Sequence, residues 1–135
     1  MSPTRETTTP FAAVARVIEL YFDGLYHSDT ERLARAFHPE ALYASASDGT
    51  LLYRTMADYF PVVERRPSPA SRGEARRDRI RSIEFAGPVT ARAAVNCAIG
   101  DTYFTDFLSL VFVDDRWQII AKVFHGEQLA DVGSR

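Results

Sequence analysis

The stretch that decides the fold runs from Val89 to Phe124 and reads VTARAAVNCAIG, DTYFTDFLSLVFV and DDRWQIIAKVF. Each of these three segments is rich in β-branched and aromatic residues, and short Gly or Asp turns join them. This pattern is typical of consecutive antiparallel strands. The N-terminal third has helical periodicity instead, so helices and strands are segregated along the chain. We therefore predict an α+β fold in which N-terminal helices pack on one face of a curved antiparallel sheet.

The composition is that of an ordinary globular domain. The chain has 135 residues, of which 46% are hydrophobic and 25% charged, with a net charge of −2. We expect a single domain over residues 1–135 with an ordered core over about 10–126. The low net charge predicts no nucleic-acid partner. The sequence contains no run of about 18 apolar residues, so we predict no membrane span. With a short polar N-terminus and one cysteine, Cys97, the expected location is the cytoplasm.

Two helices are predicted before the first strand. Thr9-Pro10 has the residue types of a helix start, and the residues that follow have apolar side chains at steps of three and four. These are Phe11, Val14, Ile18, Tyr21 and Leu25. They predict a helix over about 10–27. Ser28 with Glu31 resembles a capping box that begins a second helix, which His38-Pro39 should end.

The middle of the chain is predicted to hold a small hairpin, a third helix and a loop. Strands over 41–46 and 51–54 flank an Asp-Gly turn. Thr55 should cap a third helix, which contains Pro61. Residues 65–77 form a loop by composition. The main sheet then starts near Ile80, with turns at residues 87–88, 100–101 and 114–115.

Asp106 is the most informative polar residue in the predicted sheet. Period-two alternation places it on a strand face that is otherwise apolar, together with Phe104 and Leu108. A carboxyl group on such a face is costly unless it is paired or neutral. A buried neutral carboxyl group can donate to a developing oxyanion. The alternative is a structural aspartate that pairs with an arginine or a hydroxyl. Tyr21 likewise is either a core tyrosine or a donor into a pocket.

The order of elements and two local sequences resemble the NTF2-like (nuclear transport factor 2-like) superfamily. YFDGLYHSDTERLARAFHP, residues 21–39, is similar to its opening segment, and DRWQIIAKVF, residues 115–124, to its last strand. Together with FTDFLSL and RPSP at 66–69, these segments most resemble the SnoaL-like, lumazine-binding group. The resemblance covers about residues 11–125. It implies a cone with a cavity at its open end, and a fold that alone specifies no reaction.

The distant resemblance to ketosteroid isomerases implies roles for particular residues. Tyr21 falls at the oxyanion-hole tyrosine, and Asp106 falls near the acidic oxyanion partner. The general-base position falls at Ser45, and a serine at its normal pKa cannot take a proton from carbon. That mechanism is therefore not carried over. His38 or His125 could move a proton instead, although a histidine in the place of His38 is more often a cap or surface residue, and one in the place of His125 is more often only a rim residue.

The cone implies a set of residues around a ligand. Tyr43 and Tyr53 flank the Asp-Gly turn and could line the mouth, or could serve only as packing. Alternation places Trp117 on one face with Ile119, Ala121 and Val123, and it places Lys122 on the opposite face as a solvated or interfacial amine. The predicted pocket consists of Ile18, Tyr21, Tyr43, Tyr53, Phe60, Phe104, Asp106, Leu108 and Trp117.

Three functions remain open from the sequence. The first is binding of a small, largely apolar ligand in the cone. The second is a cofactor-free isomerase, cyclase or dehydratase acting on a carbonyl compound. The third is a protein-interaction module that uses the sheet face or residues 65–81, which hold seven arginines against two acidic residues. A homodimer through the exposed sheet face is expected. No cofactor or metal is predicted, because no nucleotide-binding motif or metal-ligand spacing is present.

Overall fold

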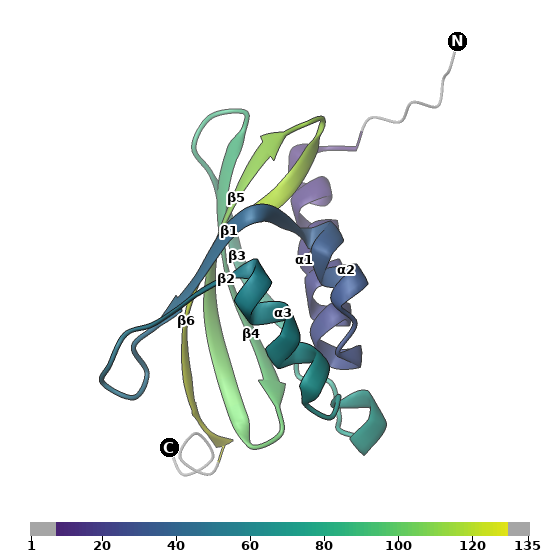
Figure 1. Cartoon of the computed structure of the whole chain (residues 1–135). Helices are drawn as coiled ribbons and strands as arrows, with labels where there is room; N and C mark the ends of the chain where they lie inside the picture. Colours follow the sequence, from purple (N-terminus) through teal and green to yellow (C-terminus); the bar gives the residue numbers. More distant parts are fainter. Residues whose placement is uncertain (1–7, 130–135) are drawn as a thin grey trace.

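The computed structural model describes residues 8–129 and consists of helices on one side of a curved six-stranded sheet (Figure 1). The helices are α1 (Pro10–His27), α2 (Thr30–Ala36), α3 (Met56–Arg65) and the single 3-10 turn η1 (Ala70–Arg72). The strands are β1 (Phe37–Ser45), β2 (Leu52–Thr55), β3 (Arg79–Phe85), β4 (Thr90–Ile99), β5 (Thr102–Val113) and β6 (Arg116–Gln128). The predicted NTF2-like α+β fold is confirmed. The predicted terminal tails lie outside the described residues, apart from residue 8.

The sheet order is β2-β1-β6-β5-β4-β3. The strands β3 to β6 form the predicted antiparallel meander, and β1 pairs with β2 as the predicted hairpin. β1 and β6 are parallel, so the sheet is mixed rather than wholly antiparallel. This pairing joins strands from the two ends of the chain and closes the small hairpin onto the meander.

The first helix begins and ends where the sequence predicts. The side chain of Thr9 accepts a hydrogen bond of 3.1 Å from the backbone N–H of Ala12, and Pro10 occupies the first turn. The apolar face of α1 is buried through Val14, Ile18 and Leu25. These residues fix α1 against the concave face of the sheet.

The predicted capping box of α2 is wrong. Ser28 is the C-cap of α1 and has a left-handed backbone with φ 50°. The N-cap of α2 is Asp29, whose Oδ1 accepts from the backbone N–H groups of Glu31 and Arg32 at 3.0 and 3.2 Å. Both residue types cap helices well. α1 ends at His27, so Ser28 with its left-handed backbone makes the turn between the two helices and Asp29 is left as the cap of α2.

A β-bulge in β6 changes which side chains of that strand face the core. Across β5, Leu110 pairs with Ile119 while Ser109 pairs with Ala121, so Ile120 is the extra residue. A bulge inverts the alternation beyond it. Lys122 is therefore buried and Val123 is exposed, the reverse of the prediction from strict alternation.

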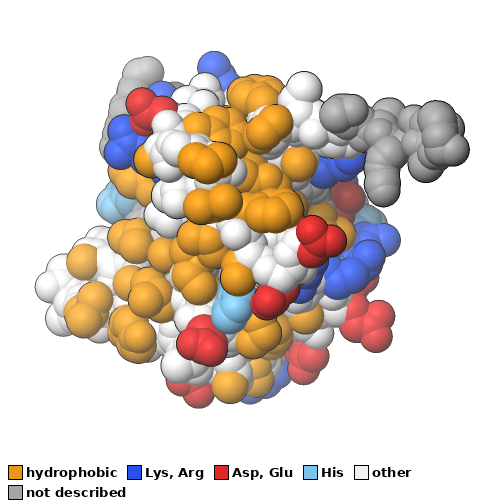
Figure 2. Space-filling model, turned by 90° about the horizontal axis from the view of Figure 1, so that it is seen from above, with side chains coloured by type: hydrophobic (Ala, Val, Ile, Leu, Met, Phe, Trp, Pro, Cys, Tyr) orange, Lys and Arg blue, Asp and Glu red, His pale blue; other side chains and the backbone are white. Residues whose placement is uncertain are grey.

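The end of the molecule that carries the β3–β4 and β5–β6 turns is rich in hydrophobic side chains (Figure 2). Exposed large hydrophobic residues there are Val89, Phe112 and Val113, with Phe11 at the start of α1. None of the described helices combines the length and apolar character needed to cross a membrane.

Candidate active site

A tyrosine and an aspartate meet at the centre of the molecule, between α1 and the sheet. The phenol of Tyr21 donates a hydrogen bond of 2.5 Å to Oδ2 of Asp106, and neither residue is exposed to solvent. Burial raises the pKa of Tyr21 well above its ordinary value, and the nearby Asp106 carboxylate raises it further. The phenol therefore stays protonated and acts as the donor of this hydrogen bond.

The second oxygen of the Asp106 carboxyl group has no partner. Oδ1 is buried and makes no hydrogen bond within the described part of the chain. Buried polar atoms are almost always satisfied, so an unpaired carboxylate oxygen is an exception that asks for a reason. It leaves one acceptor available in an apolar interior. The carboxyl group faces the concave side of the sheet, as alternation along β5 predicts.

Lys122 brings a positive charge to the same interior. Its ammonium lies 5.0 Å from the ring centroid of Tyr21, 5.3 Å from those of Tyr43 and Tyr59, and 5.1 Å from that of Phe124. These four rings enclose the cation, and aromatic faces attract cations. The ammonium makes one hydrogen bond, of 3.4 Å, to the hydroxyl of Tyr59.

No carboxylate forms an ion pair with Lys122 within the described residues. Burial by itself lowers the pKa of Lys122, but the Tyr59 oxygen and the Asp106 carboxylate outweigh that effect and raise the pKa above its ordinary value. A raised pKa favours the charged, ammonium form of this side chain. Lys122 and Asp106 form a buried pair of opposite charges that are near each other but not in contact.

A hollow of about 400 Å³ lies at the open end of the cone, beyond this buried pair. The β1–β2 hairpin and the adjoining ends of β5 and β6 surround it (Figure 1). Three aromatic side chains, those of Tyr43, Phe104 and Phe124, belong to its lining. Gly126 also lines it, and a Cβ atom there would lie 3.1 Å from the Phe104 ring. The absence of a side chain at 126 therefore leaves room for the aromatic wall.

Two of these rings separate the hollow from Lys122. Tyr43 and Phe124 contact each other, with ring centroids 4.8 Å apart, and both face the ammonium on their other side. Tyr43 is directly opposite Lys122 in the parallel pairing of β1 and β6. Asp106 pairs with Phe124 in the antiparallel pairing of β5 and β6. The charged pair thus lies one aromatic layer below the hollow.

The predicted pocket residues occupy different places. Tyr43 and Phe104 line the hollow, whereas Ile18, Tyr21, Asp106 and Leu108 are buried in the core. Phe60 packs at the edge of that core. Tyr53 is 57% exposed, because it pairs with Ala44 on the outward face of the sheet. Trp117 makes edge-to-face ring contacts with Phe85 and Phe112 near the opposite end. The hollow is therefore lined by fewer of these residues than the sequence predicts.

The two candidate histidines, His38 and His125, make no hydrogen bond or ion pair with Tyr21 or Asp106 in residues 8–129. His38 is half-buried at the start of β1, where its Nδ1 accepts from the backbone N–H of Glu40 at 2.9 Å. His125 lies within β6 rather than after it, and its side chain is exposed opposite Thr105. No cluster of three or more metal-ligating side chains is found over the same residues.

Ser45, the position that the isomerase resemblance assigns to the base, lines the hollow. Its hydroxyl lies 2.7 Å from that of Ser47 and accepts from the backbone N–H of Ser47 at 3.1 Å. Ser47 in turn accepts from the backbone N–H of Gly126 at 2.9 Å. The two serines therefore tie the hairpin to the end of β6 and form the polar part of the hollow.

Comparison with known proteins identifies the family. A family model described as "Putative lumazine-binding" matches residues 9–125. The chain belongs to this family. Among curated proteins, it is similar to the aldolase FrzH of a Cladobotryum species, with 25% identity over 119 residues that cover 88% of this chain and 93% of the relative.

The solved structures that resemble this lumazine-binding family member are NTF2-like. A protein of unknown function from Silicibacter pomeroyi has a TM-score of 0.77 and 23% identity, over 87% of this chain and 95% of its own. Another from Shewanella baltica has a TM-score of 0.78 and 24% identity, over 90% of this chain and 98% of its own. These two similarities show the fold.

Lys122 is the residue of the buried pair for which strict alternation predicts the wrong face of the strand. The signal that could have identified it is its isolation: it is the only lysine in the chain, and it sits between strongly apolar segments of a predicted strand. The bulge at Ile120 that turns it inward leaves no clear mark in the local pattern. Tyr59, its hydrogen-bond partner, is a buried residue of α3.

The arginine-rich segment of this lumazine-binding family member, residues 65–81, makes ion pairs and a cation–π contact with neighbouring side chains. Arg76 forms ion pairs with Asp23 and Asp78 at 2.8 and 2.7 Å, and its guanidinium lies 4.6 Å from the ring centroid of Tyr26. Arg72 pairs with Glu74 at 3.2 Å. Part of the positive charge of this segment is therefore balanced by acidic residues close to it.

Proposed function

We propose that this protein binds a small, largely apolar molecule in the hollow at the open end of the cone. The observation that carries the proposal is the arrangement of Tyr43 and Phe124, which line the hollow on one side and face the Lys122 ammonium on the other. A mostly apolar cavity with a few convergent polar groups is the usual form of a small-molecule site. A volume of about 400 Å³ suits a ligand of that class.

Native mass spectrometry of the protein as purified tests binding, with a ligand-sized mass as the expected result. In a matched pair of variants, Phe104→Trp fills the hollow, whereas Val89→Trp changes an exposed residue at the opposite end of the molecule. The extra mass should disappear in the first variant and remain in the second. Equal retention by both variants, or no bound mass and no thermal stabilisation by apolar carbonyl compounds, would contradict the proposal.

A second candidate is cofactor-free chemistry on a carbonyl compound of the isomerase, cyclase or dehydratase type. Two observations favour it. The buried ammonium and the free Asp106 oxygen are groups that can stabilise charge and move a proton. The curated relative with 25% identity is named an aldolase. The described structure gives His125 no part in this candidate, because its side chain points away from the cone.

We also propose that the active form is a homodimer through the outward face of the sheet. One register row crosses all six strands and carries Tyr53, Ala44, Val123, Phe107, Ala94 and Ser82. Phe107 is 65% exposed in the middle of this row, and a recess of about 450 Å³ lies directly beside it. A projection and a recess on the same surface suit a two-fold contact, in which Phe107 of each copy inserts into the recess of the other.

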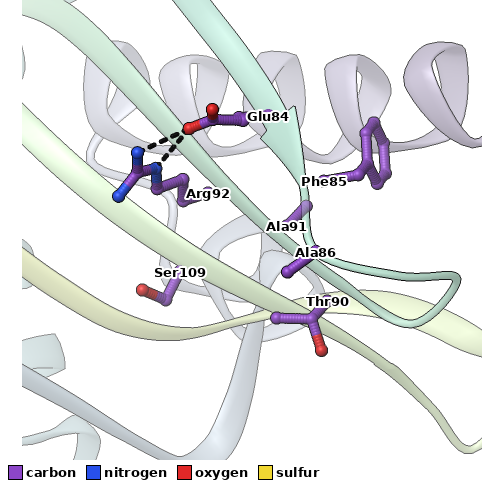
Figure 3. Close-up of a pocket in the computed structure, with 7 residues that line it drawn as sticks. All are labelled: Glu84, Phe85, Ala86, Thr90, Ala91, Arg92 and Ser109. Atoms are coloured by element: carbon purple, nitrogen blue, oxygen red, sulfur yellow. Dashed lines mark hydrogen bonds and ion pairs between the residues drawn. The ribbon is translucent and has the colours of Figure 1, made fainter.

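Charge also fits a second copy of the chain on this face. Figure 3 shows the Arg92 side chain on β4 meeting that of Glu84 on the neighbouring strand β3, with Ser109 opposite Arg92 on β5. The Arg92–Glu84 ion pair measures 2.6 Å, and both residues line the recess next to Phe107. A two-fold axis through the recess would let Arg92 of one copy meet Glu84 of the other without leaving a charge unpaired. The interaction-module reading is the weaker alternative, because the arginine segment is tied down by its own acidic neighbours.

A further inference from the structure

The Lys122 ammonium has more N–H donors than hydrogen bonds within the described residues. It is the chain's only lysine and is buried, and an ammonium group carries three N–H donors. Its hydrogen bond within the described residues is the long one to the Tyr59 hydroxyl, at 3.4 Å. Its other neighbours are ring faces, which attract the charge without accepting a conventional hydrogen bond. At least one N–H is therefore available to an acceptor that enters the interior.

On the same side of the sheet, Asp106 has one carboxylate oxygen without a hydrogen-bond partner among the described residues. Tyr21 satisfies Oδ2 and leaves Oδ1 bare. Tyr21 also ties the two charges together, because its hydroxyl holds the carboxylate while its ring faces the ammonium. The ammonium and the carboxylate form no ion pair with each other within residues 8–129, so neither charge is neutralised by direct contact with the other.

We infer that Lys122 and Asp106 form an acid–base pair that enolises a carbonyl compound, with Lys122 at the carbonyl oxygen and Oδ1 of Asp106 at the adjacent C–H. This inference deepens the proposed function and rests on it. The ligand class that it names is an apolar aldehyde or ketone with an enolisable carbon. Asp106, rather than a histidine or Ser45, is then the base that the resemblance to the isomerases leaves unassigned.

The proton and electrons balance without a cofactor. The C–H bond breaks and its proton passes to Oδ1 of Asp106. The electron pair forms the C=C bond, and the π electrons of the carbonyl move to its oxygen, where the ammonium stabilises the negative charge. The enolate can take the proton back at another carbon, which is an isomerisation. It can instead attack a second carbonyl group of the same ligand, which is an aldol cyclisation.

The role of Lys122 in this step is that of a cation and not of a nucleophile. The four aromatic rings favour the charged form, and its raised pKa agrees with that. A lysine that forms an imine must first lose its proton. Tyr43 and Phe124 must also move aside for a ligand in the hollow to reach the ammonium, so these two rings act as the gate between binding and reaction.

The test uses cyclohexanone as the probe and follows exchange of its α-hydrogens for deuterium in D2O by NMR. The wild type should accelerate exchange over buffer. Lys122→Met and Asp106→Asn should each lower the enzymatic rate by about 10²-fold or more. His125→Ala, which changes an outward side chain of the same strand, should keep the rate. Circular dichroism checks the fold, and Lys122→Gln replaces Lys122→Met should that variant not fold.

Binding and mechanism are separated by two further readouts. Saturation-transfer NMR reports whether the probe binds: binding without accelerated exchange overturns the acid–base pair and leaves the proposed binding function intact. Absence of binding to the wild type contradicts the proposed function itself. Borohydride treatment with the probe traps an imine as a stable adduct. Peptide mapping assigns the adduct unambiguously, because no other lysine exists in the chain. A trapped Lys122 adduct overturns the role of the ammonium, and an unmodified Lys122 supports it.

Discussion

Tyr21 and Asp106 lie 85 positions apart in the sequence, and in the folded chain they share a buried hydrogen bond of 2.5 Å. The bond joins the long helix α1 to the middle of β5, so it links the two halves of the cone. The bond engages only Oδ2 of Asp106, and Oδ1 makes no hydrogen bond within the described residues. Stability and the proposed chemistry therefore depend on the same pair of residues.

Removal of the Tyr21 hydroxyl should destabilise the protein. Tyr21→Phe leaves both carboxyl oxygens of Asp106 without a partner in the interior, and an unsatisfied buried group costs about 1–3 kcal/mol. Urea denaturation measures the loss. Tyr53→Phe is the control, because Tyr53 is exposed, and it should change the free energy of unfolding by less than about 0.5 kcal/mol. Equal stability of both variants would show that the hydrogen bond contributes nothing.

Stability should fall as the pH becomes alkaline. Burial, with the Asp106 carboxylate adding to it, raises the pKa of Tyr21 in the folded state, whereas an unfolded tyrosine ionises near pH ~10. The folded chain therefore holds protons that the unfolded chain loses. The stabilisation is complete below about pH 10 and declines above it, by up to about 1.4 kcal/mol per pH unit for one group.

The raised pKa of Lys122 acts in the same direction, since its folded form also keeps a proton that the unfolded form releases. Urea denaturation at about pH 8 and about pH 11 measures the combined effect. Tyr21→Phe should make the dependence on pH shallower because it removes one of the contributing groups. An unfolding free energy that is the same at both pH values would contradict this account.

The capping residue of α2 can be tested directly. Asp29→Ala removes the acceptor of two backbone N–H groups and should cost about 1 kcal/mol. Ser28→Gly should be neutral or stabilising, because Ser28 has a left-handed backbone that glycine adopts without strain. Thermal denaturation of the two variants compares them. A larger loss from Ser28→Gly than from Asp29→Ala would restore Ser28 as the cap.

Much of this fold could be predicted from the sequence, because local patterns determine most of it. The start of α1 at Pro10 and the turn at Asp114 follow from single residues with strong preferences. Alternation predicts correctly that Asp106 faces inward, because no bulge interrupts β5 between its start and Asp106. Lys122 was placed on the wrong face because one extra residue, Ile120, inverts the alternation. The parallel pairing of β1 with β6 depends on the whole fold and has no local signature.

The proposed dimer makes a prediction about the middle of the outward face. Phe107→Arg places a charge on each side of a two-fold contact and should convert a dimer into a monomer, which light scattering after gel filtration measures. Val89→Arg, at an exposed site away from the sheet face, should leave the dimer intact. A wild type that is monomeric at high concentration, or a Phe107→Arg variant that stays dimeric, would contradict the proposed interface.

The central claim is that Lys122 is a buried ammonium placed to receive the oxygen of a ligand. Selective 15N labelling of lysine gives one side-chain NMR signal, because the chain has one lysine. At neutral pH this signal should have the ammonium shift, exchange slowly with water and move when cyclohexanone is added. A signal from a neutral amine, one broadened by fast exchange with solvent, or one unmoved by bound ligand would contradict the claim.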